Sequence, residues 1–383
     1  MTPYASLSAA GFAATAITYG PARMGFGLYL NTFRDEFAIS AGTAGAISAA
    51  GFAGFLAALP IAYAVSARRS PRAPVVLGLG LAAAGMGMIA LAQGPMLLAG
   101  GAVLAMTSAG LAWTPFNLAV SRRIEARRRP EVLSIVSTGT AVGILVAALS
   151  ALAAGSDGAW RFAWAGFAGA GALAAAGAAL GMRPSGPKRS AMAGAARRLW
   201  SRRAAPLYAL AFVFGAASTV YISFAADAVE RAGVDALAPG AAASALFAVF
   251  GIAGLAGLVT APAARRLGLG LLLRLLFLAC AGSFTLIAAA PEHLPAVLVS
   301  AALQGVFVMM ISAAFAFWSE RLFPALPAMS FTAALLGVAA GSVAGPPAAG
   351  YAADAAGFAA VFAVAAIAAT LTAVLTPQRP AGA

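Results

Sequence analysis

The sequence predicts an all-α integral membrane protein with twelve transmembrane helices, divided into six plus six. Hydrophobic residues make up 62% of the chain and charged residues only 9%, whereas soluble domains carry about 25% charged residues. Apolar runs long enough to cross the hydrocarbon, about 20 residues each, recur along the whole chain. One long basic stretch, residues 183–203, separates six such runs from the other six.

The apolar runs define the elements and the domains. We expect an N-terminal six-helix bundle at 1–182, a basic cytoplasmic linker at 183–203, a C-terminal six-helix bundle at 204–376 and a cytoplasmic tail at 377–383. Pro184 and Pro187 end the sixth run, since proline cannot continue a helix. The predicted spans, in chain order, are 6–33, 42–65, 73–93, 95–121, 132–154, 160–182, 204–229, 240–264, 268–290, 292–318, 328–351 and 357–376.

Composition excludes several classes of function. A single cysteine, Cys280, rules out an intramolecular disulfide framework, and a single histidine, His293, argues against a histidine-based metal site. We find no phosphate-binding glycine loop with a lysine, no catalytic triad and no metal-ligand cluster. The sequence therefore predicts no enzyme, no cofactor and no metal.

The distribution of Lys and Arg residues predicts the orientation of the chain in the membrane. With the N-terminus inside, twenty of the 24 Lys and Arg residues fall in inner loops and the tail, and three fall in outer loops. This asymmetry is the positive-inside signal, so both termini are expected to be cytoplasmic. It also accounts for the net charge of +13 without a nucleic-acid partner. The Ala, Gly and Arg richness, with Lys188 as the only lysine, indicates a high-GC bacterium, and the membrane is then expected to be the bacterial inner (plasma) membrane.

Residues 60–69 and 257–266 lie at equivalent places in the two halves of the chain, and each segment ends in a pair of arginines. They resemble the loop G-x-x-x-D-x-x-G-R-R that members of the major facilitator superfamily carry between helices 2 and 3. Residues 60–69 match at Arg68 and Arg69, and residues 257–266 match at Gly257, Arg265 and Arg266. The aspartates of the pattern are replaced by Ala64 and Ala261, so gating through those acids is not expected here. The helix 11 segment Gly345-Pro346-Pro347-Ala348-Ala349-Gly350-Tyr351-Ala352-Ala353-Asp354 also resembles such transporters. The loop arginines, Gly345, Pro346 and Asp354 are therefore interpreted as gating or packing residues.

Within the superfamily, the chain resembles the YbfB-like bacterial permeases. The resemblance rests on Tyr19–Phe26, on Trp113-Thr114-Pro115-Phe116-Asn117, on Ser134–Gly139 and on Trp160-Arg161. The resemblance to the superfamily implies two six-helix halves around a central cavity lined by helices 1, 4, 7 and 10, alternating access of that cavity, and a monomer.

Arg23 is the main candidate for substrate binding. It lies within the first apolar run, where inserting an arginine costs roughly 2.5–3.5 kcal/mol, and no acid lies at the same depth to pair with it. Tyr19 lies four residues away on the same helix face, and the pair Gly20-Pro21 breaks the helix beside them. The favoured interpretation is that Arg23 binds an anion. The alternative is a structural role, in which Arg23 only ties helices together.

Four further residues are candidates for the same site because the resemblance places them on cavity-lining helices. Trp113 can stack on a planar ligand, Asn117 and Gln304 can hydrogen-bond one, and Tyr221 is preferred to Ser218 and Thr219, which more often bond their own backbone. The alternatives are packing for Trp113 and helix–helix bonding for Asn117 and Gln304.

The positions of the acidic residues do not show whether transport is coupled to protons. None lies near the centre of a predicted span, so an obvious carboxylate relay for protons is lacking. Asp227 and Glu230 lie at the outer end of a predicted span. We favour the interpretation that they are solvated helix caps over the alternative that they form an outer-gate pair with Arg34 or Arg231. We expect a secondary transporter of a small solute, favouring an organic anion with or without a co-transported proton. Efflux of hydrophobic or cationic compounds, and a non-transporting sensor or scaffold, are the alternatives.

Overall fold

The computed structural model describes residues 3–125, 128–154, 159–182, 199, 201–234, 237–238, 240–323 and 327–378. Nearly all of the predicted linker, 183–203, and most of the tail, 377–383, lie outside the described residues. The described part is helical throughout, as the apolar runs predict. It contains ten helices that are long and apolar enough to cross a membrane.

The chain groups into two compact units, and each is described by itself. The first comprises Met1–Phe26 and Ala50–Ser190, and the second comprises Gly27–Ala49 and Ala191–Ala383. The segment 27–49 therefore groups with the C-terminal part of the chain, although it precedes most of the first unit in sequence. The predicted six-helix domains remain a prediction.

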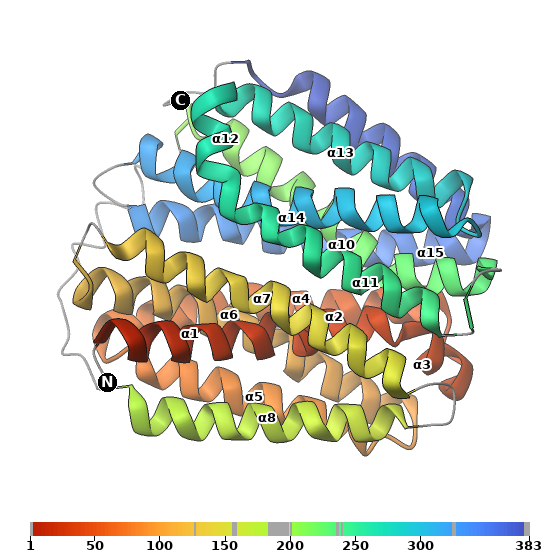
Figure 1. The fold of residues 1–383 in the computed structure, drawn as a ribbon, viewed down its shortest axis with the longest axis horizontal. Helices are drawn as coiled ribbons and strands as arrows, with labels where there is room; N and C mark the ends of the chain where they lie inside the picture. Colours follow the sequence, from red (N-terminus) through yellow and green to blue (C-terminus); the bar gives the residue numbers. More distant parts are fainter. Residues whose placement is uncertain are drawn as a thin grey trace. The chain divides into compact units, whose positions relative to one another are not determined.

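In the first unit, α5 packs against both α6 and α8, and α1 packs against α7 (Figure 1). The pairing of α1 with α7 depends on glycine: a Cβ on Gly20 would lie 2.7 Å from the Cα of Gly143, so only glycine permits this approach. The helices of this unit are α1 (Pro3–Tyr19), α2 (Pro21–Leu28, shared with the second unit), α4 (Ala41–Arg68, also shared), α5 (Arg72–Ala90), α6 (Pro95–Arg123), α7 (Arg129–Ala154) and α8 (Trp160–Gly181).

In the second unit, α15 packs against α10 and α13, and α14 packs against α11 and α13 (Figure 1). The contact of α15 with α10 uses the glycines of α15, since a Cβ on Gly345 would lie 2.9 Å from the carbonyl oxygen of Ala216. The helices of this unit are α3 (Leu30–Phe37), α10 (Ala205–Ala232), α11 (Ala241–Gly254), the 3₁₀ turn η2 (Leu255–Val259), α12 (Thr260–Leu267), α13 (Leu269–Ala289), α14 (Leu294–Leu322) and α15 (Pro327–Leu375).

Two places account for the difference between twelve predicted spans and ten long helices. The predicted first span is divided into α1, α2 and α3 by breaks at Gly20 and Tyr29, so none of the three pieces reaches spanning length. The Gly20 break was expected from Gly20-Pro21, and the Tyr29 break was not. At the other end of the chain, the last two predicted spans join into α15 across Gly357, whose φ of 81° and ψ of 165° are not helical.

Candidate functional site

The Arg23 guanidinium of the first unit is surrounded by aromatic rings. Its Cζ lies 5.3 Å from the ring centroid of Tyr19, 5.1 Å from that of Phe52 and 4.8 Å from that of Phe55. All three distances are within the range of cation–π attraction. We call Tyr19, Phe52 and Phe55 the Arg23 cage. The cage supplies electrostatic stabilisation to the cation without supplying a negative charge.

Within the part of the chain that the structure describes, no acid neutralises Arg23. Among the described residues, Arg23 makes no ion pair or hydrogen bond, and its Nε is buried without a partner. The Arg23 side chain as a whole is partly exposed. A guanidinium presents its N–H donors in a planar fork that matches a carboxylate or phosphate. The aromatic rings of the cage lie around the guanidinium carbon, and the unused N–H donors are available to an anion.

The local structure explains how Arg23 reaches the cage. Arg23 lies in the first turn of α2, immediately after the break at Gly20, while Tyr19 ends α1. Close packing of α1 on α7 at Gly20 and Gly143 fixes the position of this break. Tyr19 also makes edge contacts with Phe55 and with Trp113 of α6, each with 6.5 Å between ring centroids. The structure thus brings together three of the predicted residues, Tyr19, Arg23 and Trp113.

Two residues of the cage, Phe52 and Phe55, were not predicted. Both come from α4, both are 1% exposed, and our sequence argument considered only the four helices that the resemblance assigned to the cavity. A signal was available in the sequence: these phenylalanines lie three residues apart on one helix face within a run otherwise rich in Ala and Gly. The side chain of Asn117 lies outside the described residues, so its predicted role stays a prediction.

Tyr221 and Gln304 belong to the second unit, where they accompany a hydroxyl cluster. The Tyr221 hydroxyl lies 2.9 Å from the Oγ of Ser300, and that Oγ lies 2.9 Å from the Oγ of Ser283. Ser283 and Ser300 also donate to each other's backbone carbonyls at 2.9 Å. These bonds tie α10, α13 and α14 together. The interpretation of Tyr221 as a ligand contact therefore competes with a structural role seen directly in the hydrogen bonds.

Gln304 has fewer hydrogen-bond partners than Tyr221. It is 0% exposed and lies beside the thiol of Cys280, and its amide nitrogen and oxygen make no hydrogen bond of good geometry with the residues that the structure describes. A buried amide without partners costs roughly 1–3 kcal/mol for each group. Gln304 therefore has the hydrogen-bonding capacity for a small polar group or an internal water.

The residues interpreted as gating or packing groups have different environments. The loop arginines Arg68, Arg69, Arg265 and Arg266 are exposed. Pro346 is buried, and a Cβ on Gly45 would meet its carbonyl. Gly345 packs on α10 as described above. Asp354 accepts hydrogen bonds from the backbone N–H groups of Ala41 and Gly42, at 3.0 and 2.7 Å.

The expectation of solvated acidic caps is wrong for Asp227. The Asp227 side chain is 0% exposed and pairs with both Arg34 and Arg231, the latter at 2.8 Å. Burying a carboxylate requires a compensating charge, and the two arginines provide it. Glu230 does act as a cap, because its carboxylate accepts hydrogen bonds from the backbone N–H groups of Gly240 and Ala243 before and within α11.

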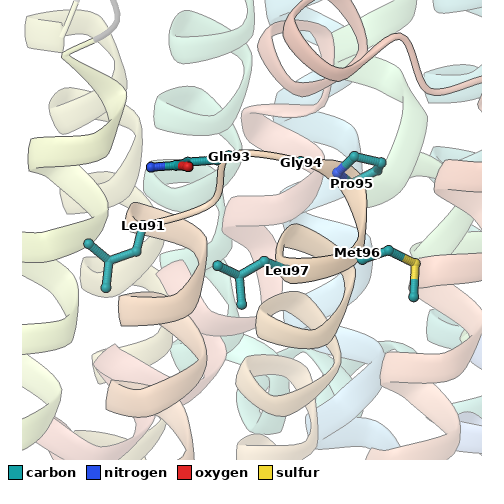
Figure 2. Close-up of a pocket in the computed structure, with 6 residues that line it drawn as sticks. All are labelled: Leu91, Gln93, Gly94, Pro95, Met96 and Leu97. Atoms are coloured by element: carbon teal, nitrogen blue, oxygen red, sulfur yellow. The ribbon is translucent and has the colours of Figure 1, made fainter.

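A surface hollow of about 330 Å³ lies at the turn between α5 and α6 (Figure 2). It contains none of the predicted site residues and no charged side chain. Its position at a helix turn, with a mostly apolar lining, offers nothing to hold an anion. The lining residues are Leu91, Gln93, Gly94, Pro95, Met96 and Leu97.

Comparisons with known proteins agree on the fold. A bacterial homologue of the human lysosomal transporter Spinster, in an inward-facing and unoccupied conformation, is 17% identical over 99% of this chain and 96% of that chain, with a TM-score of 0.71. The nucleoside transporter NupG is 14% identical over 98% of both chains, with a TM-score of 0.74. At these identities the likeness concerns the fold alone. A search of curated proteins gives no match.

The sequence matches the profile of one protein family. The profile of the Major Facilitator Superfamily matches residues 10–291, which is more than half of the chain and includes the Arg23 cage. The long apolar helices agree with a multi-pass membrane protein. The chain belongs to the major facilitator superfamily of membrane transporters.

Proposed function

We propose that this protein is a secondary transporter that moves a small organic anion by alternating access, with Arg23 as the counter-charge for the substrate. The observation that carries the proposal is the unpaired, partly exposed guanidinium inside the aromatic cage. A structural arginine in a membrane protein is expected to pair with an acid or with backbone carbonyls. Arg23 does neither among the described residues, so its charge is available to a ligand.

The cage suits a carboxylate better than a hydrated inorganic anion. A carboxylate accepts two parallel N–H donors from one guanidinium, which fixes its orientation. The rings of the Arg23 cage and of Trp113 supply apolar surface beside the cation, and such surface favours an organic body attached to the carboxylate. A monocarboxylate is therefore our preferred substrate class, with Tyr19, Trp113, Asn117, Tyr221 and Gln304 as the further substrate contacts.

The setting of the transporter is part of the proposal. The charge asymmetry of the loops supports twelve spans, an inner-membrane location and both termini in the cytoplasm. The motifs around Tyr19 and Trp113 support membership of the YbfB-like branch, and the resemblance to the superfamily implies a monomer. Without a carboxylate near mid-membrane, uniport, anion exchange, and symport in which the anion carries its own proton are the coupling modes considered.

The test is uptake into proteoliposomes containing the purified protein, using a panel of labelled monocarboxylates, dicarboxylates, organic cations and neutral drugs. We expect uptake of one or more carboxylates that falls at least tenfold in Arg23→Met, a variant that keeps the apolar stem and removes the charge. Arg161→Met is the matched control, since Arg161 already donates to the carbonyl of Ala92 at 2.8 Å. Transport of cations or neutral drugs alone would refute the proposal in favour of efflux. Carboxylate uptake unchanged in Arg23→Met would refute Arg23 as the counter-charge.

A further inference from the structure

A second surface hollow, which we call the Arg72 hollow, lies on the first unit at the start of α5. Its volume is about 530 Å³, and it is formed by the turn before α5, the first two turns of α5 and the last turn of α8. The two helices pack against each other (Figure 1). The hollow shares no residue with the Arg23 cage. The lining residues are Ser70, Arg72, Ala73, Val76, Leu77 and Ala179.

Arg72 gives this hollow a positive charge. Its side chain is partly buried, and among the described residues its guanidinium makes no ion pair or hydrogen bond. Its backbone N–H donates to the Oγ of Ser70 at 3.3 Å. The sequence contains no acid from residue 37 to residue 124 and none in α8, so the elements that form the hollow carry no compensating charge. Arg68 and Arg69, both exposed, add positive charge just before α5.

The remainder of the lining is mostly apolar and leads onto the open surface of the two helices. Leu77 of α5 is 55% exposed, and Leu180 at the end of α8 is 89% exposed. Further along the same helices, a Cβ on Gly80 or on Gly177 would have nothing within 4 Å. Gly80 follows Arg72 by about two turns of helix, which is about 12 Å along the axis. The Arg72 hollow therefore joins a cation to an uncovered apolar surface.

A cation beside an apolar surface matches the two parts of an anionic phospholipid. A guanidinium binds a phosphate through two parallel N–H donors, and an acyl chain can cover the exposed leucines. A soluble phosphate would use the arginine and leave the apolar part of the hollow uncovered. The Lys and Arg distribution supports placing this end of α5 on the cytoplasmic side, where anionic headgroups attract cations next to the membrane. This step rests on the orientation in the proposed function, but not on Arg23 or on the substrate.

We propose that the Arg72 hollow binds one anionic phospholipid, with the lipid phosphate on Arg72 and an acyl chain along Leu77 and Gly80 between α5 and α8. The charge selects the headgroup, because a zwitterionic lipid brings its own cation to the same place. The acyl chain contacts both helices, so the bound lipid also stabilises the α5–α8 contact of the first unit.

The test is native mass spectrometry of the full-length protein, titrated with phosphatidylglycerol and separately with phosphatidylcholine of the same acyl chains. We expect the first phosphatidylglycerol to bind wild type at least about fivefold more tightly than phosphatidylcholine, which corresponds to about 1 kcal/mol. Arg72→Gln should remove this preference. Arg321→Gln is the matched control and should keep it, since Arg321 is an exposed arginine in the last turn of α14, on the second unit.

A second variant distinguishes a lipid from a soluble anion. Ala73→Trp fills the hollow at an exposed position and keeps Arg72, so it should weaken phosphatidylglycerol binding at least about fivefold, and millimolar inorganic phosphate should not displace the lipid from wild type. Equal affinity of wild type for the two lipids, an unchanged preference in Arg72→Gln, phosphatidylglycerol binding unchanged in Ala73→Trp, or displacement by phosphate would overturn the proposal. The lipid preference of wild type needs neither a variant nor a substrate, so it remains decisive if the organic-anion proposal fails.

Discussion

The Arg23 cage predicts a measurable coupling between Arg23 and Phe55. Phe55 is the nearest ring, at 4.8 Å from the guanidinium carbon, and it is 1% exposed. Phe55→Leu keeps an apolar side chain in place but removes the aromatic ring that attracts the cation. Arg23→Met removes the charge and keeps an apolar stem. Each single variant also changes packing, so only the coupling between them isolates the attraction.

The expected size follows from the geometry. A desolvated cation–π contact contributes about 0.5–2 kcal/mol, and three rings share this guanidinium. We therefore expect a coupling free energy of about 1 kcal/mol between Arg23→Met and Phe55→Leu, on top of a packing loss below about 1.5 kcal/mol for the ring substitution alone. The packing loss of Phe55→Leu cancels in the double-mutant cycle, because it occurs both with and without the charge of Arg23.

The assay is a double-mutant cycle on the free energy of unfolding, measured by reversible denaturation in mixed detergent micelles. Phe284→Leu with Arg23→Met serves as the control cycle, since Phe284 contacts Tyr221 and Phe362 rather than an arginine. We expect no coupling in the control. A Phe55 coupling indistinguishable from that control would show that the guanidinium does not rest against the ring, and the cage would then not be the site that holds Arg23.

Two further predictions concern the packing that positions the two units' helices. Gly143→Ala should destabilise the protein by about 1–3 kcal/mol, because the added Cβ would meet the carbonyl of Ala16 in α1. Gly169→Ala is the control and should be neutral, since a Cβ there has nothing within 4 Å. Equal unfolding midpoints of the two variants would contradict the α1–α7 contact. Ser300→Ala should cost about 1–3 kcal/mol, because it removes the hydroxyl that bonds both Tyr221 and Ser283. Adding Tyr221→Phe should recover part of this loss, since no Tyr221 hydroxyl is then left to satisfy, and a neutral Ser300→Ala would remove the hydroxyl cluster as a stabilising element.

Most of the helices and part of the candidate site could be predicted from the sequence. Apolar runs of spanning length predict helices because a bilayer leaves no other partner for the backbone, and the Gly20-Pro21 pair correctly marked a break beside Arg23. The Tyr29 break depends on packing around that residue, which composition does not encode. The non-helical backbone at Gly357, by contrast, lies where the last predicted span begins. The arginine itself was evident because a charge in an apolar run is costly.

What the sequence could not supply were partners far apart along the chain. Phe52 and Phe55 reach Arg23 from another helix, and the pairing of Asp227 with Arg34 joins residues 193 positions apart. Local sequence patterns do not reveal such contacts. Asp227 was therefore expected to be solvated, whereas its buried carboxylate is the centre of an ion-pair network. The cap of α4 by Asp354 was missed for the same reason.

The most direct test of the central claim is the thermal stability of the purified protein with a panel of organic anions, measured in parallel on wild type, Arg23→Met and Arg161→Met. A ligand that binds only the folded state raises the apparent Tm, by an amount that corresponds to about 2.7 kcal/mol at a hundred times its Kd. We predict that at least one carboxylate stabilises wild type and Arg161→Met and leaves Arg23→Met unchanged. Equal stabilisation of all three proteins, or a response of wild type to cations and neutral compounds only, would contradict anion binding at Arg23.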